Sequence, residues 1–420
     1  MLPLPPVSEG PFLGRQSRRE SNSSVFEWEI VFWQRMVAIH QAPLIVALAA
    51  RPGVKVTYVA EEMVGENRRA LGWHAPFLGA ATLVIVNSPE RVASLLPTFS
   101  GDAVHVCQGF RSNGLVGVAQ EYLRKRGAHI FIVTETVDDR GLVGIIKRFW
   151  YALCIMWAKH WVDSVLAIGE KTSTWFGKRG FPTLRIFPFC YFLDASHQAR
   201  LSCDVENVGR PFHFAFIGSF IRRKRLDLLI DALAGLVDGH NFRITIVGAG
   251  PLEDVQRRLA FDRLGERVVW RGLLPASEIS PLLAEVDCLV LPSQFDGWGC
   301  VVSEALLAGT PAICSDTCGA AGVVRYSQSG GVFRADDREA LQACLLQAVN
   351  RGVVRGRERA ALANWAMRCI GGTAGASYFM QILRNRFEGC PRPDPPMLNA
   401  RSRPSRGPQF QSDIERSTYF

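Results

Sequence analysis

The sequence predicts an α/β protein of two domains, each built on a parallel β-sheet. The chain has 420 residues, more than the roughly 100 to 200 of one typical domain. Its 48% hydrophobic and 21% charged residues match a globular protein and exclude collagen-like, coiled-coil and wholly disordered chains. Short β-branched runs alternate with longer helical patterns in two successive series. Two Rossmann-like halves joined by a polar linker account for these observations.

The expected strands fall into two groups. The first group lies at 54–60, 81–87, 103–107, 129–135 and 164–169. After a polar stretch at 195–210, the second group lies at 212–218, 242–248, 267–272, 287–293 and 311–316. Near the end, 360–387 has helical composition interrupted by Gly371 and Gly372, which predicts two helices joined at a glycine break.

The domain boundaries follow from these series and from the composition of the two ends. Both ends are rich in Pro, Ser and Arg without sustained periodicity, which is typical of disorder. We therefore expect a disordered N-terminal tail (1–24), an N-terminal Rossmann-like domain (25–200), a C-terminal Rossmann-like domain (201–370), a C-terminal helix (371–388) and a disordered tail (389–420).

Charge and cysteine content limit the partners and the compartment. Lys and Arg number 48 against 39 Asp and Glu, and this excess of +9 favours anionic partners without choosing among them. Eleven cysteines form no CxxC pair and have no His at ligand spacing, so neither a disulfide framework nor a metal site is indicated. The first twenty residues contain Pro, Glu and Arg where a signal peptide needs an apolar core. We expect a cytoplasmic protein.

The apolar segment 149–158 is bracketed by basic residues, including Lys147. Ten residues cannot span a bilayer. Its mixture of Trp150, Trp157 and Trp161 with basic residues fits a helix at a lipid interface, on the inner face of the cytoplasmic membrane. A buried helix of the N-terminal domain is the competing interpretation, and the continuous apolar run favours it.

The first candidate ligand loop follows the run 212–218. Gly218 and Ser219 lead into four consecutive cations, Arg222, Arg223, Lys224 and Arg225, and a helical pattern comes next. A glycine that permits close approach and a group of cations suit a polyphosphate. A solvated basic turn fits the same residues.

A second loop contains Gly248 and Gly250 directly after the run 242–248. The third glycine of the dinucleotide-binding fingerprint is missing, so the motif is weak evidence. A tight turn facing a ligand and a plain structural turn fit equally well.

The third loop is the most informative and spans 291–311. A strand ends at Ser293, the glycine-containing loop Asp296–Gly299 follows, and a helix holding Glu304 ends at Gly309. Free backbone amides at a helix N-terminus suit an anionic group, and two acids beside them could hold sugar hydroxyls. The alternative makes Asp296 an N-cap and Glu304 a solvated helix acid.

From about Phe212 to Arg325 these motifs, in this order and at these distances, resemble the C-terminal domain of the GT-B retaining glycosyltransferases of family four. The N-terminal half resembles the same family more loosely, through residues 40–43, 70–73 and 164–176. The resemblance implies a GT-B architecture, with two Rossmann-like domains facing a central cleft. It also implies a sugar transferase of bacterial cell-envelope polysaccharide or lipopolysaccharide biosynthesis that needs no metal or other cofactor.

The resemblance also implies roles for individual residues. Lys224 and a nearby Arg would bind the donor diphosphate, and Glu304 would bind the ribose of the nucleotide sugar. The family's Arg after the first glycine is Ser219 here, so Arg222 or Arg223 would substitute. Asp296 replaces the first acid of the family's Glu-x7-Glu motif and would still reach a donor-sugar hydroxyl. The remaining donor contacts would come from Gly218, Gly248, Gly250, the nucleobase-lining segment with Arg271 and Gly272, and the amides of Gly297, Trp298 and Gly299.

On the acceptor side the same resemblance points to His40, which follows a segment containing Trp33 and Gln34, and to Glu135, which ends the run 129–135. The partner there would be a saccharide or a lipid-linked saccharide. A core histidine and a solvated charged loop are the alternatives for these two residues.

Two other functions remain open on the sequence. A nucleotide-sugar hydrolase or epimerase of the same fold would turn over the donor alone, and a non-catalytic nucleotide-sugar-binding subunit is permitted by Ser219 and Asp296. A dehydrogenase is disfavoured because the glycine fingerprint is incomplete. Nucleic-acid binding is disfavoured because no recognised motif accompanies the positive charge.

Overall fold

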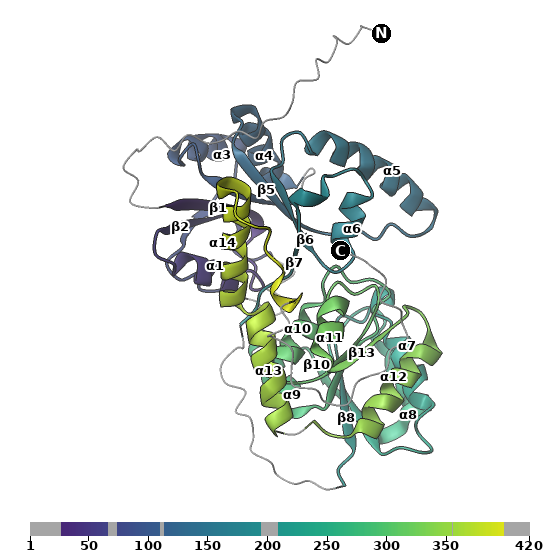
Figure 1. The fold of residues 1–420 in the computed structure, drawn as a ribbon. Coiled ribbons are helices and arrows are strands. Elements are labelled where there is room, and N and C mark those ends of the chain that lie inside the picture. The colour runs from purple at the N-terminus through teal and green to yellow at the C-terminus, as the bar shows by residue number, and fades with distance from the viewer. Residues whose placement is uncertain (1–26, 66–73, 110–112, 195–208, 355, 399–420) are drawn as a thin grey trace.

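The computed structural model describes residues 27–65, 74–109, 113–194, 209–354 and 356–398, and Figure 1 shows its two α/β domains. In this described part the N-terminal sheet is parallel, with strand order β3-β2-β1-β4-β5-β6-β7. Its strands are β1 (Trp28–Met36), β2 (Val54–Glu62), β3 (Thr82–Ile85), β4 (Val104–Gln108), β5 (His129–Glu135), β6 (Ser164–Ile168) and β7 (Ile186–Phe189). Its helices are α1 (Ala42–Ala49), α3 (Pro89–Leu95), α4 (Gly114–Arg126), α5 (Gly141–Ala158) and α6 (Thr172–Gly177).

The C-terminal sheet is also parallel, with order β10-β9-β8-β11-β12-β13. Its strands are β8 (Phe212–Ile217), β9 (Phe242–Val247), β10 (Val268–Gly272), β11 (Cys288–Leu291), β12 (Ala312–Ser315) and β13 (Gly330–Phe333). Its helices are α7 (Leu226–Ala234), α8 (Glu253–Leu264), α9 (Ala276–Glu285), α10 (Cys300–Leu307), α11 (Ala321–Ser327), α12 (Arg338–Arg351) and α13 (Gly356–Ile370). Helix α14 (Gly372–Glu388) completes the helices of the described residues, apart from short 3-10 turns.

Both sheets carry helices on both faces, as parallel sheets do. In β1, Ile30 and Phe32 join the hydrophobic cluster that also contains α1 and α14, whereas Val31 and Trp33 join the cluster of α3, α4, α5 and α6. The strands therefore alternate between two buried faces with period two. In the C-terminal sheet, α7, α8 and α12 cover one face, and α9, α10, α11 and α13 cover the other.

The strands expected from β-branched runs correspond to β2–β6 and β8–β12, which confirms the α/β prediction. Three strands were missed: β1, β7 and β13. In β1, Trp, Gln and Arg residues interrupt the β-branched pattern by which the other strands were recognised. β13 (GGVF) begins with two glycines, which are uncommon in strands. Gly330 has φ +132°, and a Cβ there would overlap the carbonyl oxygen of Ala312 in β12. Close pairing of β13 with β12 therefore requires glycine at position 330.

The glycine break near the end is confirmed and has a packing reason. α13 ends at Ile370 and α14 begins at Gly372. A Cβ at Gly375 would overlap the ring of Phe192, and one at Gly372 would lie 2.5 Å from the carbonyl oxygen of Pro43. These glycines let α14 return to the N-terminal domain and pack against α1, as Figure 1 shows.

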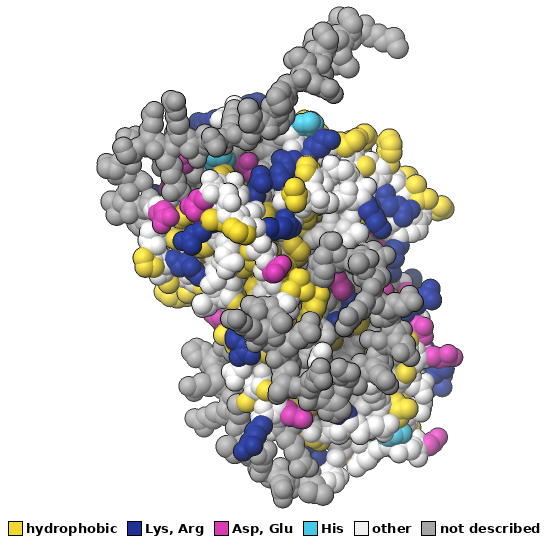
Figure 2. Space-filling view, in the orientation of Figure 1, with side chains coloured by type: hydrophobic (Ala, Val, Ile, Leu, Met, Phe, Trp, Pro, Cys, Tyr) yellow, Lys and Arg dark blue, Asp and Glu magenta, His cyan; other side chains and the backbone are white. Residues whose placement is uncertain are grey.

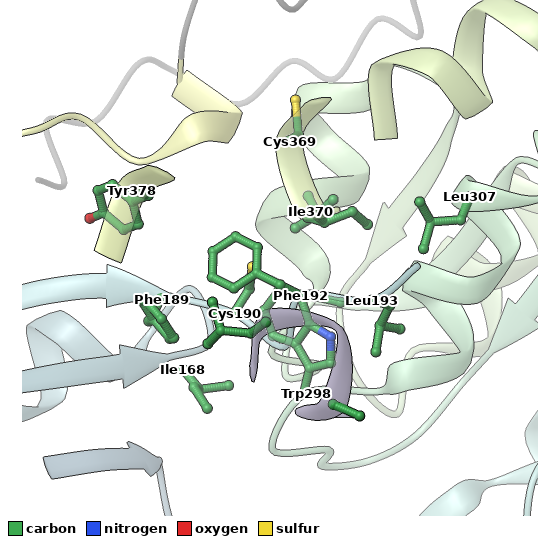
Figure 3. Packing of buried hydrophobic residues seen from close by; sticks show 14 of the residues in the cluster. Ile168, Phe189, Cys190, Phe192, Leu193, Trp298, Leu307, Cys369, Ile370 and Tyr378 are labelled. Carbon is green, nitrogen blue, oxygen red and sulfur yellow. The ribbon is translucent and has the colours of Figure 1, made fainter. Parts of the chain in front are cut away.

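One hydrophobic cluster continues from the N-terminal domain into the C-terminal domain. Figure 3 shows Phe192 of the N-terminal domain beside Trp298 of the other domain, and all of the labelled residues belong to this cluster. The backbone N–H of Leu193 donates to the carbonyl oxygen of Ile370 at 2.9 Å. The two segments that connect the domains thus lie side by side.

The predicted C-terminal tail differs from the structure over residues 389–398. Arg392 stacks over the ring of Phe187 at 4.5 Å and donates a hydrogen bond of 2.9 Å to the carbonyl oxygen of Leu184. Met397 packs against the core cluster. The stacking of this cation on an aromatic ring offsets the chain entropy that is lost when the segment becomes ordered. Composition alone does not reveal such a contact, so it predicted disorder here. The tails predicted at 1–24 and 399–420, segment 70–73 and most of the linker lie outside the described residues.

The interpretation of the apolar segment as a buried helix was wrong. It forms part of α5, which has 18 residues and is long and apolar enough, by length and composition only, to cross a membrane. Only 17% of that helix is buried. Gly144, Ile155 and Ala158 face the domain, and most other positions are exposed, because α5 lies on the outside of the domain.

Candidate active site

The basic loop after β8 places one lysine close to the loop that follows β11, the neighbouring strand in the sheet. Gly218 leads into a 3-10 turn (Arg222–Lys224), and Arg225 then takes a left-handed conformation (φ 51°) before α7. Ser219 and Arg222 are exposed, whereas Lys224 is only 15% exposed. Of these cations, Lys224 therefore lies deepest.

Lys224 forms an ion pair with Asp296. The Nζ of Lys224 lies 2.5 Å from Oδ2 of Asp296, and the hydroxyl of Ser293 donates to the same oxygen at 3.3 Å. Arg223 lies 3.9 Å from the other carboxylate oxygen and donates to the carbonyl oxygen of Phe295 at 2.7 Å. The structure thus joins the first and third predicted loops through charge.

The loop Asp296–Gly299 is held by backbone contacts with the loop after β12. The N–H of Gly319 donates to the carbonyl oxygen of Asp296 at 3.0 Å, and the N–H of Ala320 donates to that of Trp298 at 2.8 Å. Gly299 has φ +86° and starts α10, and a Cβ there would lie 2.7 Å from Sγ of Cys318. This position requires glycine for conformation and for space.

The N-terminal domain contributes Glu135, at the end of β5, to the same place. A Cβ on Gly297 would overlap the carboxylate of Glu135, so the two residues are in close contact across the domain boundary. Burial raises the pKa of Glu135, and the neighbouring charge of Asp296 raises it further. A hydrogen bond from Tyr191 and the positive charge of Arg223 lower that pKa and offset part of the shift.

Glu304 is the fifth residue of α10, and its carboxylate forms no hydrogen bond or ion pair with another described residue. Burial alone raises the pKa of its carboxyl group to about 7. Its side chain is nevertheless partly accessible to solvent. A half-buried carboxylate without a partner is expected where a ligand supplies the hydrogen-bond donors.

The three acids and the lysine surround one point at the start of α10. The thiol of Cys300, the first residue of α10, feels the negative charges of Glu304, Glu135 and Asp296 and the positive charge of Lys224. Burial and these carboxylates together raise the pKa of Cys300 well above its usual range. Residues from β5, β8, β11 and α10 thus form one site, as expected at the carboxyl ends of parallel strands.

Other predicted donor residues have mainly structural surroundings. A Cβ on Gly248 (φ +139°) would overlap the carbonyl oxygen of Gly218, and one on Gly250 would lie 2.7 Å from that of Phe220. The second loop therefore supports the first by close backbone packing, which favours the structural-turn interpretation. Arg271 is exposed and Gly272 has φ +63° at the end of β10.

The side chain of Trp298 is not available to a ligand. It is 3% exposed, and its indole N–H donates to the hydroxyl of Ser303 at 3.0 Å. Figure 3 shows the indole within the cluster that joins the domains. Any ligand contact at this position is limited to the backbone, as the sequence predicted.

His40 lies near Glu135, with Tyr191 between them. The rings of His40 and Tyr191 are 6.3 Å apart, and Tyr191 also bonds to Glu135. His40, Gln41 and Tyr191 line a pocket together with the ends of β5, β6 and β7. The structure thus brings the two predicted acceptor residues into one neighbourhood.

Sequence reasoning missed Tyr191 and the contacts that join the domains. The loop after β6 touches the loop after β12: Lys171 lies 3.1 Å from Asp316, and the N–H of Glu170 donates to the carbonyl oxygen of Gly319 at 3.1 Å. Glu170 also pairs with Arg325. Gly169, directly after a predicted strand, was the available signal.

Two parallel-sheet domains whose strand ends meet at a shared site define the GT-B fold. The structure resembles that of HepE from Anabaena in complex with UDP, with a TM-score of 0.63 and 16% identity, covering 85% of this chain and 100% of that one. This likeness confirms the predicted fold class.

Residues 211–351, which form most of the C-terminal domain, match the model of the family described as Glycosyl transferases group 1. The chain is 33% identical to the 2-deoxystreptamine glucosyltransferase of Streptomyces kanamyceticus over 166 residues, which are 37% of this chain and 43% of that one. It is 30% identical to the lipopolysaccharide glucosyltransferase WaaG of Escherichia coli over 146 residues, 33% of this chain and 37% of that one. The chain spans about a third to a half of the length of the curated relatives it matches.

Proposed function

We propose that the protein is a glycosyltransferase that moves a sugar from a nucleotide-sugar donor to a saccharide or lipid-linked saccharide acceptor. The observation that carries this proposal is the convergence of Lys224, Asp296 and Glu304 with Glu135 at the start of α10. The family whose model the C-terminal domain matches supports the reaction type. The word lipopolysaccharide in the name of WaaG supports a place in cell-envelope biosynthesis. We propose that the protein acts on the cytoplasmic side of the membrane.

In the donor complex the diphosphate would lie between Lys224 and the first turn of α10. Lys224, Arg223 and the free amides that follow Gly299 supply positive charge there. As the sugar leaves, these groups would stabilise the developing charge on the diphosphate. Because the protein supplies this charge itself, we propose that transfer needs no metal ion.

Glu304 would accept hydrogen bonds from the two ribose hydroxyls. The carboxylate needs such donors, since burial already disfavours its charged form. Asp296 would hold a hydroxyl of the donor sugar while it remains paired with Lys224. This arrangement would connect sugar recognition to phosphate recognition through one ion pair.

Glu135 would face the acceptor. It comes from the other domain and contacts the loop that would hold the donor sugar. A carboxyl group whose pKa is raised by burial can take a proton from a hydroxyl near neutral pH. We place the incoming acceptor hydroxyl between Glu135 and His40, and we propose transfer with retention of the anomeric configuration.

The test is a calorimetric titration of the whole protein with UDP, GDP, ADP and their common sugar conjugates, without added metal. UDP is titrated first because HepE was crystallised with it. Selective binding that Lys224→Ala weakens is the expected result. Well-folded protein that binds none of these nucleotides contradicts the donor site.

The preferred donor then tests transfer itself. With a saccharide acceptor present, the product's anomeric proton coupling in NMR reports retention. Turnover of donor at an unchanged rate without acceptor would instead identify a nucleotide-sugar hydrolase or epimerase. Binding without any turnover would identify a non-catalytic subunit.

A further inference from the structure

Helix α5 presents a large apolar surface to solvent. Leu142, Ile146 and Phe149 are 84%, 71% and 69% exposed. The other exposed large apolar side chains of this helix are Val143, Ile145, Trp150, Leu153, Met156 and Trp157. Figure 2 shows yellow side chains along the edge of the upper domain where α5 lies. A contiguous apolar patch of this kind marks an interaction surface, whereas the apolar side chains exposed on most proteins are isolated from one another.

The patch is a stripe along one side of the helix. At about 100° per residue, Leu142, Ile146, Phe149, Leu153 and Met156 fall on one face, at spacings of four and three. The buried positions of α5, including Gly144 and Ile155, lie opposite. Lys147 and Arg148 fall on the two borders of the stripe, where their charges can stay in water while the stripe is covered. This distribution is typical of helices that lie in a membrane interface.

The neighbouring helix adds basic and aromatic groups beside the stripe. The guanidinium of Arg124, in the last turn of α4, lies 5.5 Å from the ring centre of Trp157. A groove between the two helices is lined by residues that include Tyr122, Lys125 and Trp161. Glu121 pairs with Arg124 at 2.8 Å and with Lys125 at 3.4 Å and offsets part of this charge.

Two cations on α5 or directly after it, Arg148 and Lys159, form no ion pair with an acid among the described residues. Lys147 donates to the backbone carbonyl of Asp138, and its charge also lowers the pKa of the Asp138 carboxyl group. Positive charge next to an apolar stripe complements anionic lipid headgroups above an acyl layer. Tryptophan rings at the border of such a stripe also favour the headgroup level.

Topology indicates that α5 lies along the membrane and does not cross it. The helix connects β5 to β6, and these strands pair with each other in parallel within one sheet. Both ends of α5 are therefore tied to the same domain. A crossing helix would also place Lys147 and Arg148 near the middle of the bilayer, which is costly.

We propose that α5 docks the protein on an anionic lipid bilayer by inserting its apolar stripe into the interface. Docking does not depend on the proposed enzyme activity. One consequence does rest on that activity. Helix α5 begins six residues after Glu135. Arg140, which lies between them, interacts electrostatically with Asp336 of the other domain. Docking through α5 therefore holds the acceptor side of the site close to the headgroups, which suits a lipid-linked saccharide.

The experiment is vesicle flotation with the full chain. Vesicles of phosphatidylcholine, with and without phosphatidylglycerol, are compared at low and high salt. We expect binding to the anionic vesicles that weakens with salt. Ile146→Gln with Phe149→Gln should lower vesicle partitioning about tenfold or more, because apolar insertion is lost. Phe261→Gln, on α8 and 77% exposed, is the matched control and should leave partitioning unchanged.

A second variant tests the charge. Lys147→Gln with Arg148→Gln should remove most of the preference for anionic vesicles, while circular dichroism remains that of the parent protein. Equal partitioning of the parent and the Ile146/Phe149 variant would overturn the proposal. A lipid-free dimer in sedimentation velocity that this variant dissociates would overturn it too, since a second copy would then cover the stripe.

The same variants separate docking from catalysis. Nucleotide titration should be unchanged in both, because none of the four residues lies at the donor site. A parent protein that binds vesicles but no nucleotide would contradict the proposed function and leave the docking proposal intact.

Discussion

Glu304 carries a charge that the folded protein solvates poorly. Burial raises the pKa of its carboxyl group to about 7, and no described residue hydrogen-bonds to it. The folded chain therefore binds a proton more tightly at Glu304 than the unfolded chain does. By linkage, this group's contribution to stability is present below about pH 4.5 and is lost as pH rises toward about 7.

We expect Glu304→Gln to stabilise the protein while it weakens donor binding. At about pH 8 the amide removes the cost of a buried charge, and the free energy of unfolding should rise by about 1–2 kcal/mol, less than the full shift because the side chain is partly solvated. Donor affinity should fall by about 1–3 kcal/mol, as expected for a lost charge-assisted contact. Denaturant unfolding and calorimetry measure the two effects. Glu278→Gln, at an exposed acid of α9, should change neither.

The same residue predicts a pH dependence. Ribose hydroxyls favour the carboxylate form, so nucleotide affinity in the parent protein should increase from about pH 6 to about pH 8. This increase should be absent in Glu304→Gln. An equal slope in both proteins would remove Glu304 from the donor site.

Lys224→Ala should weaken nucleotide binding by about 1–3 kcal/mol, because a charged contact to the diphosphate is lost and Asp296 is left without its partner. The measurement is a calorimetric titration with the preferred nucleoside diphosphate. Lys55→Ala, which breaks a partly buried pair with Glu29 away from the site, is the control for lost charge. A variant as tight as the parent would show that the phosphates lie elsewhere.

At the scale of elements, glycines decide how closely the loops approach. At the site the backbones of Gly218 and Gly248 are nearly in contact, and the backbone of Gly297 lies against the carboxylate of Glu135. Strand ends alone would leave room for side chains there. The absence of a Cβ is therefore part of the site's architecture.

Gly248→Ala should displace the loop that carries Lys224. The new Cβ would overlap the carbonyl oxygen of Gly218, and φ +139° is unfavourable for alanine. Nucleotide affinity should fall about tenfold, or about 1.4 kcal/mol. Gly265→Ala is the matched control, because it also has positive φ but open space around it. If both variants bind nucleotide equally well, the second loop does not position the first.

Gly297→Ala should lower stability by about 1–3 kcal/mol by forcing Glu135 away. In a double-mutant cycle, Glu135→Ala should relieve most of that cost, since the overlapping carboxylate is gone. Thermal unfolding of the four proteins gives the coupling energy. Additive effects would show that the two residues do not touch in solution.

At the scale of the whole molecule, the domains share one core. A hydrophobic cluster runs from the N-terminal sheet through α13 and α14 into the C-terminal sheet. α14 follows the C-terminal domain in sequence but packs on the N-terminal one. Unfolding of either domain must expose part of the shared cluster, so the two should unfold cooperatively.

Phe379→Ala tests this cooperation. Phe379 is fully buried in α14, and its ring lies about 6 Å from those of Phe32, Phe131 and Phe189. Its removal should cost about 3–5 kcal/mol. Calorimetry should show a single transition moved to lower temperature. Two separated transitions, with the C-terminal one unmoved, would mean that the domains are independent.

Most of the sheet and part of the site could be predicted from local pattern. Strands β2–β6 and β8–β12 are β-branched runs, and Gly309 ends its helix in a left-handed conformation that favours glycine. Lys224, Asp296 and Glu304 were found because ligands bind where parallel strands end. β13 could not be found, because its two glycines serve a neighbouring strand that is distant in sequence.

The sequence by itself determined the two parallel-sheet domains, because the period of its apolar residues and its helix-ending glycines act over a few positions. Tertiary structure decided that the Glu304 side chain has no partner among the described residues, that Asp296 pairs with Lys224, and that Glu135 comes from the other domain. It also decided that α5 lies on the outside of the N-terminal domain. Its apolar run is equally compatible with a core helix and with an exposed helix. Burial and charge pairing depend on residues far apart along the chain, so only the folded arrangement fixes them.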